Sequence, residues 1–165
     1  AAMFHSAAWD EGDRGVLSKE ELLETFIAND PEIAEQICYC YEHIEGAIEL
    51  MPHVIEWMEN LKSRGYHLYV ISNYGENTFE KTVDKMAFIP YMEGMIFSYQ
   101  YKMIKPDLII YEQLLKEYNL NGSECVFIDD RQVNIDAAVE AGFAAGVLFQ
   151  NYEQAKSDLN VLLEK

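Results

Sequence analysis

The chain has 165 residues, half of them hydrophobic, which suits one domain or one domain with a small appendage. Its 12 lysines and arginines are outnumbered by 29 aspartates and glutamates, giving a formal net charge of −17. This charge argues against nucleic acids and anionic membrane surfaces as partners, because both attract positively charged proteins. No apolar run approaches the roughly 18 residues of a membrane span, and we expect no secretion signal.

The cysteines and histidines show no pattern typical of a disulfide framework or a zinc site. The three cysteines are Cys38, Cys40 and Cys125. Their odd number and the absence of a C-x-x-C spacing predict free, buried thiols, which fit the reducing cytoplasm. The four histidines are His5, His43, His53 and His67. They share no metal-ligand spacing, so we expect them to be structural or exposed.

The first fifty residues have the pattern of helices throughout. Ser18 precedes Glu21 by three positions, as in a capping box, and apolar residues then recur at helical spacing. Pro31 suits the first position of a second helix. We therefore expect a helical segment with no strand in this part of the chain.

From Met51 onward, helical and strand-like segments alternate. The predicted helices cover residues 52–65, 75–88, 105–120, 131–142 and 151–165, and the predicted strands cover 66–72, 94–98, 124–128 and 143–150. Such alternation favours an α/β fold, a Rossmann-like parallel sheet with helices on both faces.

Polar residues follow the predicted strands at their carboxyl ends, where open α/β sheets bind ligands. Ser72 and Asn73 follow the first strand, Ser98 ends the second, and Asp129 and Asp130 follow the third. Lys105 lies in the loop after the second strand. A hydroxyl and an ammonium group can hold phosphate oxygens, while adjacent carboxylates suit Mg²⁺. The sequence thus predicts a site for phosphate and magnesium.

Three segments resemble sequence motifs of a known superfamily. "YVISN", "IKPDLIIYEQLL" and "VFIDDRQVNIDAAVEAGF" are similar to the second, third and fourth motifs of the haloacid dehalogenase-like (HAD) hydrolases, in that order. The segment "FHSAAWDEGDRGVLSKEELLETF" looks like the helical cap of the subgroup that contains small phosphatases and the epoxide-hydrolase amino domain. The resemblance implies a helical cap over residues 1–50 and an α/β core over residues 51–165.

The resemblance also implies roles for the residues at motif positions. Ser72 matches the hydroxyl that binds the transferring phosphoryl group, and Asn73 can add a backbone or amide contact. Lys105 matches the lysine that steadies the charge of the nucleophile and the phosphate.

The fourth motif implies the metal site. Asp130 matches the acidic ligand of Mg²⁺, and Asp129 matches its partner. Asn134 stands where other branches of the superfamily carry another acid. On this resemblance, both aspartates face a magnesium site with Lys105 close by.

One motif of the superfamily has no counterpart in this sequence. The nucleophile of these enzymes is the first aspartate of a D-x-D motif that ends the first core strand, and no D-x-D occurs here. That strand lies at the centre of the sheet in the superfamily, between the strands that end at Ser72 and Asp129. Without it, backbone groups at the middle of the sheet would be buried and unpaired. We therefore expect the sequence either to be part of a longer protein that supplies this strand or to have lost its upstream part.

The resemblance favours a Mg²⁺-dependent phosphatase that acts on a small phosphorylated metabolite through a phosphoaspartate. Two alternatives stay open at this point. One is a haloacid dehalogenase that works without a metal, and the other is an inactive module that binds a phosphometabolite or a protein. Trp9 and the nearby Phe4 and His5 are candidates to face the substrate from the cap. The oligomeric state is not indicated.

Overall fold

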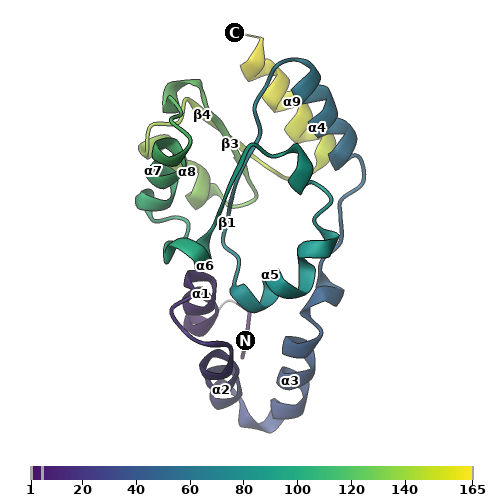
Figure 1. The fold of residues 1–165 in the computed structure, drawn as a ribbon, viewed down its shortest axis with the longest axis vertical. Coiled ribbons are helices and arrows are strands. Elements are labelled where there is room, and N and C mark those ends of the chain that lie inside the picture. Colours follow the sequence, from purple (N-terminus) through teal and green to yellow (C-terminus); the bar gives the residue numbers. More distant parts are fainter. Residues whose placement is uncertain (1, 5, 165) are drawn as a thin grey trace. The chain divides into compact units, whose positions relative to one another are not determined.

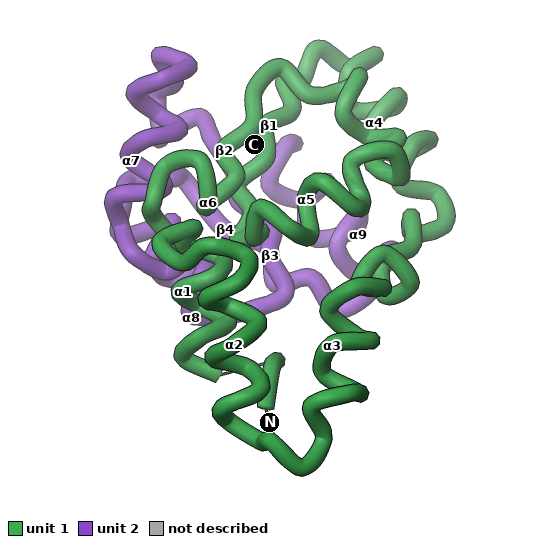
Figure 2. Tube along the Cα trace, turned by 60° about the horizontal axis from the view of Figure 1, so that its bottom comes forward, with its two compact units in different colours: residues 1–104 green, residues 105–165 purple. Residues whose placement is uncertain are grey.

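The computed structural model describes residues 2–4 and 6–164, and the chain forms two compact units (Figure 2), residues 1–104 and residues 105–165. Helices alternate with short parallel strands from α4 (Val54–Ser63) onward (Figure 1), which confirms the α/β class. His5 lies outside the described residues. The division into a cap over residues 1–50 and a core over residues 51–165 stays a prediction.

The first unit begins with helices and then adds a small parallel sheet. Its elements are α1 (Ala7–Arg14), α2 (Lys19–Asn29), α3 (Ala34–Glu42), α4 (Val54–Ser63), β1 (Tyr69–Ser72), α5 (Glu76–Thr82), β2 (Gly94–Phe97) and α6 (Ser98–Tyr101). Short 3₁₀ turns lie at Pro31–Ile33, Ile44–Ala47, Val83–Lys85 and Ile89–Tyr91. The segment before residue 50 is helical, as the sequence predicts.

The start of α2 has the predicted capping box. The backbone N–H of Glu21 donates to the hydroxyl of Ser18, and the backbone N–H of Ser18 donates to the carboxylate of Glu21 at 2.9 Å. Two backbone donors that have no partner within a helix are thereby satisfied. Phe26, on the same helix, is fully buried in a cluster with Met3, Ala8 and Ile37.

The sheet of the first unit places two polar chain segments at one edge. β1 pairs in parallel with β2, and Ser72 stands opposite Phe97. Parallel strands end on the same side of a sheet, so Ser72, which ends β1, and Ser98, which follows β2, lie at the carboxyl ends of neighbouring strands. Among the strands that the structure describes, β1 pairs with β2 alone.

The second unit is a small α/β layer. Its elements are α7 (Leu108–Glu117), a 3₁₀ turn at Gly122–Glu124, β3 (Val126–Asp129), α8 (Gln132–Glu140), β4 (Ala145–Leu148) and α9 (Tyr152–Leu163). β3 pairs in parallel with β4, and within the described residues it has no other strand partner. Helix α8 packs against both strands. Gly146 allows this close approach, because a Cβ atom there would lie 2.3 Å from Cγ2 of Ile135.

Two expectations made from composition can be compared with the structure. The three cysteines are free, as expected, but they are not all buried: Cys40 is exposed, and Cys38 and Cys125 are partly exposed. The apolar faces of their segments are filled by larger side chains, Ile37 in α3 and Phe127 in β3. None of the described helices is long and apolar enough to cross a membrane.

Candidate functional site

Lys105 and Asp129 form a partly enclosed ion pair in the second unit. Nζ of Lys105 donates to Oδ2 of Asp129 at 2.6 Å, and the two side chains are 12% and 5% exposed. Lys105 also lies over the ring of Phe127, with Nζ 5.5 Å from the ring centroid. Little solvent screens this pair, so the two charges interact more strongly than a pair on the surface.

The other oxygen of Asp129 is held by the turn that leads into α8. Oδ1 accepts hydrogen bonds from the backbone N–H of Arg131 at 2.9 Å and from the side-chain amide of Asn134 at 2.8 Å. Burial raises the pKa of Asp129, but the charge of Lys105 and the hydrogen bonds from Lys105, Arg131 and Asn134 lower it further than burial raises it. The pKa therefore lies below its ordinary value of 3.8, and the carboxylate is ionised at neutral pH.

Asp130 and Asn134 offer oxygen atoms beside this pair. The Asp130 side chain is exposed, whereas Asn134 is only 2% exposed. The amide nitrogen of Asn134 is used by Asp129, and its carbonyl oxygen is buried without a hydrogen-bond partner. An unpartnered buried oxygen on a side chain that already contacts a carboxylate is a group that a hard cation can stabilise. The residues of this turn thus fit Mg²⁺.

The same turn provides too few acidic ligands to hold a metal by itself. Within residues 2–4 and 6–164, no three His, Cys, Asp or Glu side chains lie so as to hold a metal ion together. Mg²⁺ commonly keeps several waters and takes only one or two carboxylates from the protein. The turn can therefore supply part of a magnesium site, with the other ligands coming from water, substrate or another carboxylate.

Sequence reasoning did not identify Tyr111 as part of this arrangement. Tyr111 lies in α7, is fully buried, and donates its hydroxyl to the backbone carbonyl of Asn134 at 2.9 Å. Burial is the main cause that raises its pKa, with a contribution from the charge of Asp129, so the hydroxyl keeps its proton. The available signal was a tyrosine on the apolar face of a helix, where a buried hydroxyl needs a partner.

Ser72 and Asn73, two of the three residues predicted to bind phosphate, belong to the first unit, whereas Lys105 belongs to the second. Ser72 ends β1 and is partly exposed, and Asn73 follows it. Ser98 is fully buried and serves the backbone: its hydroxyl donates to the carbonyl of Asp13 and accepts from the N–H of Tyr74 at 2.8 Å. Ser98 therefore fixes the chain that follows β1, while the hydroxyl of Ser72 stays the candidate for binding phosphate.

Three comparisons relate the chain to known proteins. It is 26% identical over 165 residues to flavin mononucleotide hydrolase 1 of Arabidopsis thaliana, covering 96% of this chain and 63% of that protein. It is 22% identical to a sesquiterpene phosphatase of Aspergillus oryzae, covering 85% of this chain and 71% of the relative. A magnesium complex of a HAD family enzyme from Bacteroides thetaiotaomicron shares the fold, with a TM-score of 0.73, 20% identity, and coverage of 98% of this chain and 81% of that one.

The family assignment rests on a match over most of the chain. The sequence model of the haloacid dehalogenase-like hydrolases matches residues 4–142. The matched stretch contains the strand end at Ser72, the Lys105–Asp129 pair and the turn with Asp130 and Asn134. The chain therefore belongs to the haloacid dehalogenase-like hydrolase family.

Proposed function

We propose that this chain is the greater part of a Mg²⁺-dependent phosphatase that acts on a small phosphorylated metabolite. The observation that carries the proposal is the Lys105–Asp129 pair, flanked by the exposed carboxylate of Asp130 and the unpartnered oxygen of Asn134. A phosphate ester requires positive charge and a cation held by oxygen ligands. The two relatives compared by sequence are named a flavin mononucleotide hydrolase and a sesquiterpene phosphatase, and these names support the phosphatase class.

Each residue of the proposed site has a role that follows from its chemistry. The hydroxyl of Ser72 donates to an oxygen of the phosphoryl group. Lys105 supplies positive charge, and its bond to Asp129 fixes the position of its ammonium group. Asp130 and Asn134 hold the cation, which when bound offsets negative charge on the phosphate.

The nucleophile is proposed to come from a part of the protein that precedes this sequence. The chain spans 63% of the length of the flavin mononucleotide hydrolase, so the activity of the whole protein is a proposal. β1 and β3 each have a strand partner on one edge in the described residues, which leaves an edge of each able to pair with a further strand. A strand that carried an aspartate at its carboxyl end would supply the missing reactive group.

The test compares the 165-residue chain with the longer protein expressed from its natural upstream sequence. We expect the longer protein to release inorganic phosphate from 4-nitrophenyl phosphate only with Mg²⁺, and the shorter chain to release none. In the longer protein, Lys105→Ala should lower kcat/KM by at least about 100-fold, because an oriented charge is lost at the transition state. Lys116→Ala is the matched control, since Lys116 is an exposed lysine of the same unit.

The magnesium assignment has a separate readout. Asp130→Asn should raise the Mg²⁺ concentration for half-maximal binding, measured by calorimetry, by about tenfold or more, because an amide is a weaker ligand than a carboxylate. Asp136→Asn, a change at an exposed aspartate of α8, should leave it unchanged. An unaltered titration in Asp130→Asn refutes its role as a ligand, and chloride release from a 2-haloacid without Mg²⁺ would favour the dehalogenase alternative.

A further inference from the structure

Three segments of the first unit meet at one buried hydroxyl. Ser98 follows β2, begins α6 and is fully buried. Its hydroxyl accepts the backbone N–H of Tyr74, in the chain after β1, at 2.8 Å and donates to the backbone carbonyl of Asp13, in α1. A hydroxyl has one proton and two acceptor lone pairs, so both bonds form together. The carbonyl of Tyr74 lies farther away, at 3.4 Å, so the proton goes to Asp13.

The end of α1 is docked on α6 at further points. The carbonyl of Asp13 is one of the last in α1, and such carbonyls have no partner within a helix, so Ser98 supplies one. Nζ of Lys102 donates to the carbonyl of Gly15, the residue that caps α1. Gly15 also lies close to α6, because a Cβ atom there would be 2.7 Å from the carbonyl oxygen of Tyr99. The last turn of α1 is thus held in place by α6.

Tyr74 is fixed at its side chain as well as at its backbone. Its hydroxyl lies 2.8 Å from that of Thr82, a fully buried residue of α5. The hydroxyl of Thr82 donates to the backbone carbonyl of Thr78 at 2.6 Å, so its oxygen accepts the proton of Tyr74. Burial is the main cause that raises the pKa of Tyr74, so this donor keeps its proton at neutral pH. The ring of Tyr74 packs against Phe97, with centroids 5.9 Å apart.

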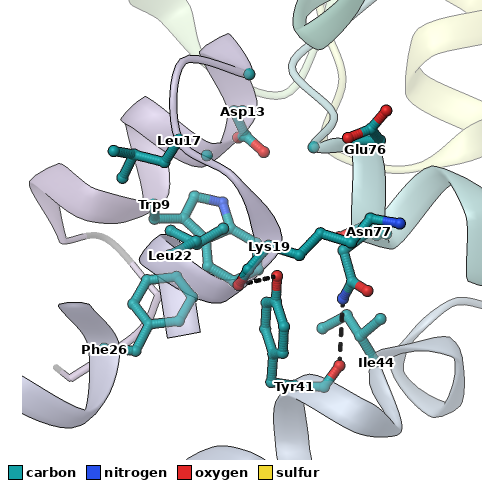
Figure 3. A pocket seen from close by; sticks show the side chains of 14 residues that line it. Trp9, Asp13, Leu17, Lys19, Leu22, Phe26, Tyr41, Ile44, Glu76 and Asn77 are labelled. Carbon is teal, nitrogen blue, oxygen red and sulfur yellow. Dashed lines mark hydrogen bonds between the residues drawn. The ribbon is translucent and has the colours of Figure 1, made fainter. Parts of the chain in front are cut away.

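The residue after Tyr74 lies directly against α1. Gly75 is buried, and a Cβ atom there would lie 3.2 Å from the carbonyl oxygen of Gly12. The pocket beside this contact holds only about 30 Å³, room for a water molecule, and Asp13 and Glu76 line it from α1 and from α5 (Figure 3). Little free space therefore separates α1 from the chain after β1.

These anchors lie next to the residue proposed to bind the phosphoryl group. Ser72 is fixed on one side by the pairing of β1 with β2, and Asn73 alone separates it from the anchored Tyr74. The direction in which Ser72 presents its hydroxyl therefore depends on the bond between Ser98 and Tyr74. A group misplaced by about 1 Å can slow a reaction about 100-fold, so such an anchor affects rate as well as stability.

We propose that Ser98 is a positioning residue of the phosphatase, which holds the N–H of Tyr74 and through it the backbone that presents the hydroxyl of Ser72 to the phosphoryl group. The same hydroxyl ties this backbone to Asp13, so phosphate binding at Ser72 and the docking of α1 are linked. The proposal rests on the phosphatase function above, and it gives Ser98 no contact with the substrate.

The first test needs no catalytic activity and uses the 165-residue chain. Ser98→Ala removes the acceptor of the Tyr74 N–H, so hydrogen exchange of that amide, followed by NMR on the folded proteins, should become at least about tenfold faster. The amides of Gly15 and Val16, at the end of α1, should also exchange faster. Exchange of the Tyr74 amide that is as slow as in wild type would overturn the proposal.

Ser6→Ala is the matched control. The hydroxyl of Ser6 makes the same two kinds of bond at the start of α1, because it donates to the carbonyl of Met3 at 2.6 Å and accepts the N–H of Trp9 at 3.1 Å. This change should speed exchange at Trp9 and leave the Tyr74 amide unaltered. An equal increase at Tyr74 in both variants would mean that Ser98 acts through general stability, and would overturn its role as a specific anchor.

The second test measures coupling in the longer protein, with 4-nitrophenyl phosphate and Mg²⁺. Ser98→Ala should lower kcat/KM and raise the inhibition constant of inorganic phosphate by about tenfold each. In a Ser72→Ala background the same change should alter both by less than about twofold, because the hydroxyl that Ser98 positions is gone. Tyr74→Phe loses only the bond to Thr82, should depend on Ser72 in the same way, and takes the place of Ser98→Ala if that variant does not fold.

The positioning role and the phosphatase function fail in different ways. Effects of Ser98→Ala and Ser72→Ala that multiply would overturn the positioning role and keep the phosphatase, and so would an unchanged kcat/KM in Ser98→Ala. No hydrolysis of any phosphate ester by the longer wild-type protein would overturn the phosphatase, and with it the role of Ser98 in that reaction.

Discussion

The surroundings of Asp129 decide its charge. A carboxylate with so little exposure loses hydration, and the structure replaces that hydration with one ammonium group and two N–H donors. The sequence could indicate that Lys105 and Asp129 share a site, because both follow strands of a parallel sheet. It could not indicate which oxygen each donor takes, nor that Tyr111 holds the carbonyl of Asn134, because these depend on how α7 and α8 pack.

This pair has a consequence for stability that depends on pH. The folded-state pKa of Asp129 lies below its ordinary value of 3.8, so the ionised pair stabilises the fold above about pH 4. That contribution is lost as the pH falls through the folded-state pKa. We expect Lys105→Met to lower the free energy of unfolding by about 3 kcal/mol at pH 7, because it leaves a buried charge unpaired.

Urea unfolding of wild type and Lys105→Met at pH 7 and at about pH 3 tests this expectation. The difference between the two proteins should shrink at the lower pH, since protonation of Asp129 removes the unpaired charge. Lys116→Met should change the free energy of unfolding little at either pH, because Lys116 is exposed. A difference that stays constant with pH would show that the loss comes from packing and not from the charge of Asp129.

At the scale of helices and strands, local sequence patterns predicted most of the elements but not all of them. The capping box at Ser18, the alternation after Met51 and the strand ends at Ser72 and Asp129 are all present in the structure. Helix α6 was missed, because a four-residue helix that starts at the buried Ser98 has no apolar period of its own. It forms where the hydroxyl of Ser98 accepts the Tyr74 N–H, a contact that no local pattern contains.

The capping box gives a prediction for the helix that it begins. Ser18→Ala removes the acceptor for the N–H of Glu21 and should lower the free energy of unfolding by about 1 kcal/mol. Hydrogen exchange of the amides in the first turn of α2 should rise with it. Ser157→Ala, at an exposed position inside α9, is the matched control and should be neutral or slightly stabilising. Equal losses in the two variants would mean that the cap bond contributes nothing.

At the scale of the whole molecule, the charge and the arrangement of strands have different origins. The net charge of −17 follows from composition alone. The grouping of four parallel strands into the pairs β1–β2 and β3–β4 does not, because strand neighbours depend on contacts between distant segments. What the sequence did predict, from the absence of a D-x-D motif, is that a strand between those ending at Ser72 and Asp129 is missing; among the described residues β1 pairs only with β2 and β3 only with β4.

The net charge predicts how the protein responds to salt. Repulsion among the excess carboxylates should destabilise the folded chain, and salt screens that repulsion. We expect Tm, followed by circular dichroism at pH 7, to rise by several degrees between about 20 and 300 mM NaCl. A Tm that falls over this range would mean that attractive pairs, such as Lys62 with Glu93, outweigh the repulsion.

The close meeting of two glycines beside the pocket has a consequence for how such proteins diverge. A Cβ atom at Gly75 would lie 3.2 Å from the carbonyl oxygen of Gly12, and one at Gly12 would lie 2.6 Å from the side chain of Leu22. A side chain at Gly75 would therefore press on the backbone of α1, whereas one at Gly12 would press on the side chain of Leu22 in α2. Descendants of this sequence should therefore keep Gly75, whose added side chain would meet backbone, more strictly than Gly12, whose added side chain would meet the movable end of Leu22.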